Sequence, residues 1–175
     1  MATDLPWGRS LEWPEVQQTE REVTLAAGPD HRAIIARDLG LEGLAALRGD
    51  LTLRPWLDGV AIEGCVVAEM TRMCGVSLES FVVAIDEPIK VRIVPMGSPN
   101  APSTDAAEVI VDLESEDPPD EATSGVIDLA AYVVEALALA LDPFPRQPGA
   151  VFSPPEDTGP ISPFAVLSTL SRRPS

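Results

Sequence analysis

Three side chains in the sequence have the chemistry of soft metal ligands, or of a nucleophile with its base: His31, Cys65 and Cys74. His31 is the only histidine, and the two cysteines lack the CxxC spacing that is typical of zinc sites. A free buried cysteine usually behaves as a small hydrophobe. We therefore expect no bound metal, no cofactor and no Ser-His-Asp or Cys-His catalytic arrangement.

Other signatures of catalysis are also missing from the sequence. No segment matches GxxxxGK[ST] or GxGxxG, the glycine-rich loops that hold phosphate groups. The adjacent acids Asp86 and Glu87, like Glu116 and Asp117, lie beside prolines in predicted turns. Carboxylates in such turns are normally solvated rather than paired for glycoside hydrolysis. The sequence thus predicts a protein that is not an enzyme.

The distribution of charge is the strongest functional signal. The 175 residues include 12 Lys or Arg and 28 Asp or Glu, and residues 93–145 hold eleven of the acids and no base. Such a segment repels phosphate and attracts basic partners over a Debye length of ~8 Å. We expect it to bind a basic partner and not DNA; the alternative is a loop that is merely solvated. The acids assigned to this partner-binding segment are Glu114, Glu116, Asp117, Asp120 and Glu121.

The elements that must position these groups follow from hydrophobic periodicity. Alternating apolar residues predict strands at 20–26, 47–53 and 60–71, and Asp58-Gly59 joins the last two as a hairpin. Residues 78–94 predict a third long strand broken at Glu87-Pro88, because proline cannot donate to a central ladder. Residues 108–113 add an exposed edge strand. Helices are expected at 31–41, at 128–141 with Asp128 as N-cap, and after Ser162-Pro163.

These elements predict an α+β fold in one domain of residues 1–175, with an antiparallel sheet of three to five strands and two or three helices. A chain of this length can bury a core without disulfides. We expect residues 1–19 to form an extended arm and 20–94 to form the sheet and first helix. Residues 95–125 are predicted to be a mobile acidic segment, and 126–171 the core helix and a proline-rich C-terminal segment.

No basic, apolar and small-residue leader is visible at the start of the sequence. The most apolar run, residues 126–141, is shorter than the ~20 residues that a membrane-spanning helix needs. We therefore expect a cytoplasmic protein without membrane association.

Several motifs together resemble one known family. Residues 127–129 (IDL) and 135–150 (EALALALDPFPRQPGA) resemble the C-terminal signature of the large ribosomal RNA subunit accumulation proteins, the YceD family, in its alphaproteobacterial branch. Supporting matches lie at 37–41, 47–56, 70–79, 85–88 and 162–167, so the resemblance spans residues 20–171.

Three positions depart from the family's pattern. Thr71 stands where many relatives have the first cysteine of a CxxC, Phe144 replaces a tyrosine and Gln147 replaces a lysine. The first change removes a metal ligand, and the last removes a contact to phosphate.

The resemblance implies a non-catalytic factor that supports accumulation of large-subunit ribosomal RNA and assembly of the large subunit. Two direct partners remain possible: ribosomal RNA, or a basic large-subunit ribosomal protein that binds to the acidic segment. The charge favours the protein, because RNA affinity rests on cations that neutralise phosphates. A small-molecule or protein-interaction module unrelated to the ribosome is the remaining alternative. The residues predicted to face RNA are Arg32, Arg37, Arg48 and Arg54.

The proline-rich part of the resemblance is a second candidate binding surface. Its restricted backbone presents Phe144 and Arg146 at fixed positions, so little entropy is lost on binding. The alternative is that these residues only lock the C-terminal segment onto the core. The candidate residues are Asp142, Pro143, Phe144, Pro145, Arg146, Pro148, Gly149, Pro163 and Phe164.

Overall fold

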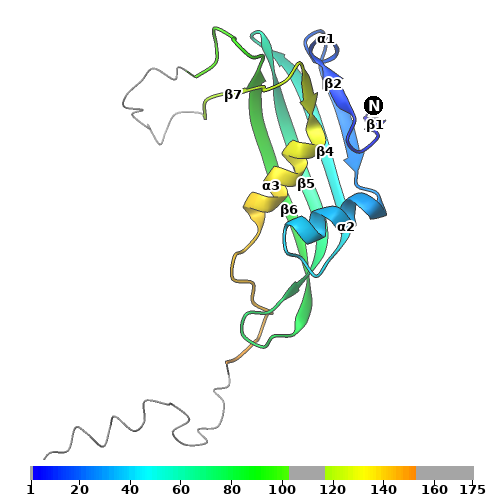
Figure 1. Cartoon of the computed structure of the whole chain (residues 1–175), viewed down its shortest axis with the longest axis vertical. Helices are drawn as coiled ribbons and strands as arrows, with labels where there is room; N and C mark the ends of the chain where they lie inside the picture. Colours follow the sequence, from blue (N-terminus) through cyan, green and yellow to red (C-terminus); the bar gives the residue numbers. More distant parts are fainter. Residues whose placement is uncertain (1, 103–116, 153–175) are drawn as a thin grey trace, which may run out of the picture.

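The computed structural model describes residues 2–102 and 117–152, which form a six-stranded mixed sheet, a two-stranded sheet and three helices (Figure 1). The expected α+β class is confirmed. The main sheet is larger than expected and is not purely antiparallel, because both of its outermost strands run parallel to their neighbours.

Four antiparallel strands make up the body of the main sheet. Their order in space follows the chain, and a hairpin joins the second to the third as expected. Its turn lies at Leu57 and Asp58, one residue earlier than the expected Asp58 and Gly59, because Gly59 already pairs with Trp56. One face is buried and the other exposed along these strands, which is what the alternation of apolar and polar residues predicts. The strands are β3 (Arg21–Ala26), β4 (Gly43–Trp56), β5 (Gly59–Met73) and β6 (Ser80–Val94).

The expected break at Glu87-Pro88 is wrong, because β6 continues through it and pairs Pro88 with Cys65 of β5. On its other side β6 pairs only with β7 (Asp120–Glu121), at Ile93 and Val94. Its outer edge is therefore open at Pro88 among the described residues. Proline is tolerated in an edge strand, where a missing N–H leaves no partner unsatisfied.

The N-terminal residues are part of the fold instead of an extended arm. They form β1 (Thr3–Leu5), which adds to β3 in parallel, and then β2 (Ser10–Glu12) and α1 (Trp13–Val16). Strand β2 pairs with β8 (Val126–Asp128) in the small sheet. One residue from each N-terminal element is buried: Leu5, Leu11 and Val16.

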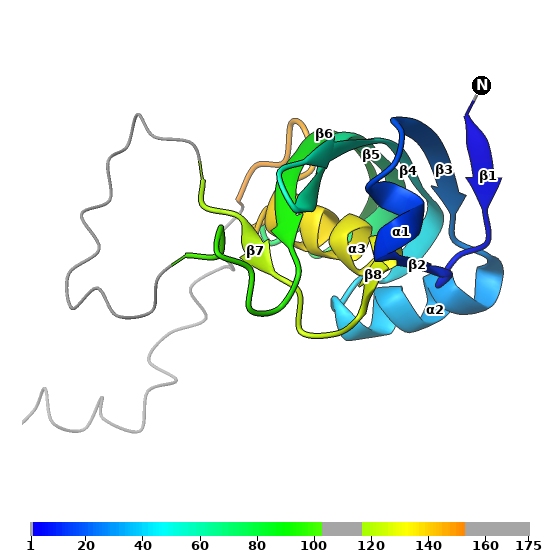
Figure 2. The ribbon, with the colours of Figure 1, turned by 90° about the horizontal axis from the view of Figure 1, so that it is seen from above.

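The two longer helices, α2 (Pro29–Asp38) and α3 (Leu129–Ala140), lie on the concave side of the main sheet, which curves around α3 (Figure 2). Asp128 caps α3 as expected, since its carboxylate accepts hydrogen bonds from the N–H groups of Ala130 and Ala131 at 3.0 and 3.2 Å. Helix α3 packs closely on β4: a Cβ at Gly49 would lie only 2.6 Å from Cγ2 of Val133. The concave side therefore holds the core.

Some expected features lie outside the described residues. They are the edge strand at 108–113, the C-terminal helix, and the candidate residues Glu114, Glu116, Pro163 and Phe164. Within the described ranges, no helix combines the length and the apolar character needed to cross a bilayer.

Candidate functional site: an acidic groove and a clamped proline-rich segment

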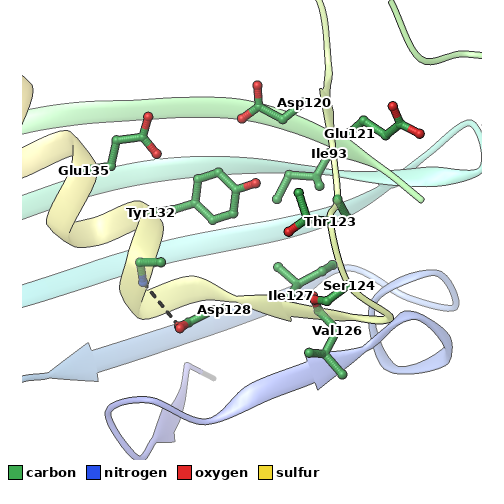
Figure 3. Close-up of a pocket in the computed structure, with 12 residues that line it drawn as sticks. Ile93, Asp120, Glu121, Thr123, Ser124, Val126, Ile127, Asp128, Tyr132 and Glu135 are labelled. Atoms are coloured by element: carbon green, nitrogen blue, oxygen red, sulfur yellow. Dashed lines mark hydrogen bonds between the residues drawn. The ribbon is translucent and has the colours of Figure 1, made fainter. Parts of the chain in front are cut away.

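A groove runs between β6, the segment around β7, and α3. It consists of two adjoining hollows of 410 and 770 Å³ that share Asp120, Tyr132 and Glu135. Figure 3 shows the residues that line the smaller hollow. We call the two together the acidic groove, because its lining has three times as many acids as bases. The bases are Lys90 and Arg92, and the acids are Glu87, Asp117, Asp120, Glu121, Asp128 and Glu135.

The two bases belong to the convex side of the sheet. Side chains alternate along a strand, so Lys90 and Arg92 project opposite to Val91 and Ile93, which face the core. The guanidinium carbon of Arg92 lies 5.1 Å from the ring centroid of Trp56, near enough for a cation–π contact. The Arg92 guanidinium is thus held against Trp56 on the convex face.

Tyr132 reports the electrostatics inside the groove. Its ring stands between Glu135 of the same helix and Asp120 (Figure 3). Partial burial, reinforced by the charges of Asp120 and Glu135, raises the pKa of Tyr132 to about 12. A phenolate anion is therefore disfavoured at this position, chiefly by burial, and only the smaller contribution from Asp120 and Glu135 depends on the sign of the charge.

The structure places all three described acids of the predicted partner-binding segment in this groove. Asp120 and Glu121 form β7, and the Glu121 carboxylate accepts a hydrogen bond from the N–H of Gly97 at 2.6 Å. Asp117 lines the larger hollow. The acids come from part of the segment that was expected to be a mobile loop, but Asp120 and Glu121 are paired with β6 instead.

The four arginines predicted to face RNA do not share one surface. Arg48 and Arg54 lie on the convex face of β4, whereas Arg32 and Arg37 belong to α2 on the other side of the sheet. All four donate hydrogen bonds within the chain. Their partners are Asp50 for Arg48 at 2.7 Å, Glu20 and Glu63 for Arg54 at 3.1 and 3.2 Å, Asp38 for Arg37 at 2.8 Å, and the carbonyl of Ala27 for Arg32 at 3.0 Å.

The proline-rich segment is anchored through its backbone to the tip of the β5–β6 hairpin, as Figure 1 shows for the orange part of the chain. We call this contact the hairpin clamp. Three hydrogen bonds define it: Arg72 Nη2 to the carbonyl of Asp142 at 3.0 Å, the Gly75 N–H to the carbonyl of Pro145 at 2.9 Å, and the Gln147 N–H to Sγ of Cys74 at 3.4 Å.

The sulfur of Cys74 is the centre of the hairpin clamp. It is fully buried and accepts hydrogen bonds from the N–H groups of Val76, Ser77 and Gln147, each at 3.4 Å. Hydrogen bonding, first from the Ser77 side chain and then from the backbone N–H groups of Ser77 and Gln147, lowers the pKa of Cys74 to about 6. Through the hydrogen bond that it accepts from the Gln147 N–H, the Cys74 sulfur holds the proline-rich segment in place.

The side chains of the same segment point away from the clamp. Phe144 is 79% exposed, and Arg146 is also exposed. The Phe144 N–H is held by the Asp142 carboxylate at 2.8 Å. Thus the backbone is fixed to the fold while an aromatic ring and a cation are presented to solvent.

The three side chains considered as metal ligands are not brought together. His31 lies on α2 beside Trp7, with ring centroids 6.4 Å apart, and Cys65 is on the convex face of β5. Both cysteines are free thiols, and burial raises the pKa of Cys65. In the part of the chain that the structure describes, no three His, Cys, Asp or Glu side chains are grouped to hold a metal ion.

Sequence reasoning did not assign Tyr132, Glu135 or Cys74 to a site. Glu135 interrupts the most apolar helix, and Tyr132, the only tyrosine, precedes it by three residues, which places both on one helix face. That spacing was an available signal. Nothing in the sequence indicates that residues 72–75 and 142–147 meet.

Comparisons of the chain with protein-family models, with curated proteins and with solved structures give no match.

Proposed function

We propose that the chain is a non-catalytic cytoplasmic factor in assembly of the large ribosomal subunit. In this proposal it supports accumulation of large-subunit ribosomal RNA by binding a basic large-subunit ribosomal protein. The motifs at 127–129 and 135–150 motivate the ribosomal part of the proposal. The observation that carries the choice of partner is the acidic groove.

The groove favours a cationic protein for electrostatic reasons. It gathers acids from two distant parts of the chain, residues 117–121 and 135, around one half-buried tyrosine. Charges that line a concave surface focus the field and raise the association rate of an oppositely charged partner. Six acids line the groove against two bases, Lys90 and Arg92.

The arginines argue against RNA as the direct partner. Three of the four predicted RNA-facing residues, Arg37, Arg48 and Arg54, are ion-paired with carboxylates of the same chain. A phosphate would have to compete with those carboxylates. RNA affinity depends on the number of phosphates neutralised, so this arrangement offers few contacts.

Neutralising the groove tests the proposal. The test variant carries Asp117→Asn, Asp120→Asn, Glu121→Gln and Glu135→Gln. The matched control changes net charge equally at exposed acids outside the groove: Glu42→Gln, Glu69→Gln, Glu79→Gln and Asp86→Asn. Both are compared with the wild type for binding to a purified basic large-subunit ribosomal protein and to large-subunit RNA fragments.

We expect the groove variant to lose affinity for the ribosomal protein while the control stays near the wild type. Wild-type affinity should fall as salt rises, because the Debye length shrinks from ~8 Å at 0.15 M to ~3 Å at 1 M. Tight binding of RNA at physiological salt, unaffected by the groove variant, would contradict the choice of partner. Equal loss in both variants would show that net charge alone is responsible.

A further inference from the structure

A second groove lies between α2 and α3 and is bounded by the turn at Trp7 and Gly8. We call it the helix groove. Its volume of 500 Å³ lies within the range of ~300–1,000 Å³ that is usual for binding sites. Eight of its eleven lining residues are apolar or glycine, and none belongs to the main sheet. The helix groove is therefore a largely apolar hollow on the helical layer.

Helix α3 lines the helix groove with a face that differs from the one in the core. Val133 and Leu137 are fully buried, whereas Ala131, Val134 and Ala138 line the groove. Positions three, four and seven residues apart share one side of a helix, so these three form a continuous apolar strip. Ala131 and Ala138 are exposed. No element of the described chain covers this strip.

Larger apolar side chains complete the helix groove. Ile34 of α2 is 50% exposed there, although it is an isoleucine. The ring of Trp7 lies beside His31 of α2, with ring centroids 6.4 Å apart, so the turn at Trp7 is in contact with that helix. The small side chains of Ala131 and Ala138 leave space beside these large ones. The groove thus accepts a leucine or an aromatic ring, the kind of side chain that anchors protein interfaces.

The charge beside the helix groove is negative. Asp128 and Glu135 line it, and its lining contains no Lys or Arg. Glu135 is exposed and also lines both hollows of the acidic groove. This side chain therefore stands on α3 between an acidic hollow and an apolar one. A partner that lies across α3 meets carboxylates on one side and apolar surface on the other.

These properties identify the occupant as a basic amphipathic helix. Such a helix lays residues at i, i+3, i+4 and i+7 into an apolar groove and keeps its other sides for charged residues. At ~1.5 Å per residue, the strip from Ala131 to Ala138 is ~10 Å long, which matches about two helical turns. A second copy of this chain is a poorer occupant, because its formal charge of −16 opposes approach to Glu135.

We propose that the helix groove binds the apolar face of a basic amphipathic helix of the protein partner, whose Lys and Arg side chains reach Glu135 and the acidic groove. This inference rests on the proposed function and specifies how the partner is held. The helix groove supplies apolar anchoring, and the acidic groove selects positive charge.

The test uses the full chain and a fluorescent eighteen-residue peptide of Leu, Lys and Ala with its leucines on one helix face. A second peptide has the same composition, but its leucines are spread around the helix. Anisotropy measures affinity. Ala138→Gln fills the helix groove with a polar side chain, and Ala33→Gln is the matched control at an exposed position of α2 outside it. Gln is a good helix former, and neither substitution changes the charge.

NMR of methyl groups locates the bound peptide. The reporters are Ile34 and Val134 in the helix groove, and the references are the exposed Val67 and Val82 of β5 and β6. We expect the amphipathic peptide to bind and to shift the reporters but not the references. Spreading the leucines and Ala138→Gln should each weaken binding by about tenfold, the effect of losing ~1.4 kcal/mol. Ala33→Gln should leave affinity unchanged.

Three results would overturn this inference. Equal binding of the two peptides would show that charge alone holds them. Reporter shifts that depend on the concentration of the free protein would show that a second copy fills the helix groove. Tighter peptide binding by the full chain with Leu167→Asp, a change outside the described residues, would assign the groove to the chain's own C-terminal residues.

Failure of this inference is distinguishable from failure of the proposed function. If neutralising the acidic groove weakens binding of the ribosomal protein but Ala138→Gln does not, only the role of the helix groove is wrong. If that protein does not bind the wild type at all, the proposed function itself fails.

Discussion

Replacing Gly49 by alanine should destabilise the protein through one contact between β4 and α3. The added Cβ would lie 2.6 Å from Cγ2 of Val133, well inside the ~3.5–4.0 Å that is optimal between carbon atoms. Val133 is fully buried, and a valine in a helix strongly prefers one rotamer, so it cannot easily turn away.

The expected magnitude combines two opposing effects. Overpacking in a core typically costs about 1–3 kcal/mol. Replacing a glycine within a strand by alanine recovers about 0.5–1 kcal/mol of backbone entropy. The free energy of unfolding should therefore fall by up to about 2.5 kcal/mol, and by about 1 kcal/mol at the centres of these two ranges.

A second substitution isolates the contact. Val133→Ala removes two buried methyl groups, at about 1.6 kcal/mol, and also removes the clash. In that background Gly49→Ala should stabilise the protein by about 0.5–1 kcal/mol. Urea unfolding followed by tryptophan fluorescence measures each variant, with equal m-values as the check that midpoints are comparable. If Gly49→Ala has the same effect in both backgrounds, the packing of α3 on β4 is refuted.

Three further predictions concern single groups. Because the pKa of Cys74 in the fold is about 6, below its ordinary 9.0, its stabilising effect is complete above pH 9 and disappears as pH falls through 6. The urea midpoint of the wild type should therefore rise between pH 6 and 9 relative to the midpoint of Cys74→Ala. Cys65→Ala, the control, should show the same dependence of midpoint on pH as the wild type. If the midpoints of the wild type and Cys74→Ala change with pH in parallel, the hairpin clamp is contradicted. Tyr132 is the only tyrosine, so absorbance at 295 nm should give a pKa of about 12 in the folded protein and one near 10 in urea. Its raised pKa stabilises the fold below pH 10, and that stability is lost as pH rises toward 12; a folded-state midpoint near 10 would refute burial of the ring. Asp128→Ala should lower the free energy of unfolding by about 1 kcal/mol, whereas Asp128→Asn should keep most of the wild-type stability. Equal urea midpoints for the wild type and both variants would exclude Asp128 as the N-cap.

The parts of the fold that were predictable are those with long periodic signals. Helix α3 begins after Asp128 as expected because a capping carboxylate and an apolar repeat coincide there. The hairpin of β4 and β5 was predictable from alternation, although its turn lies at Leu57 and Asp58, one residue before the expected Asp-Gly pair. In both elements the local conformational preference of the residues favours the same structure as the burial of their apolar side chains.

The errors arise where position in the sheet decides the structure. A proline interrupts a central strand but is tolerated in an edge strand, and the sequence alone does not show that β6 has an open edge at Pro88. Strands of two or three residues, such as β1 and β7, are too short to show periodicity, so their parallel pairing was not foreseen. Three of the five acids assigned to a partner-binding segment lie in the groove, but Tyr132 and Glu135 join them only through tertiary packing.

The late position of α3 in the chain has a consequence for synthesis on the ribosome. All strands of the main sheet except the two-residue β7 have been made when Val94 is reached, but α3, which covers the concave face, ends at Ala140. At ~5–20 residues per second, those 46 residues take roughly 2–9 s. During that interval the apolar side of the nascent sheet lacks its cover, so chaperone binding to stalled nascent chains should peak between these two points and end once α3 emerges.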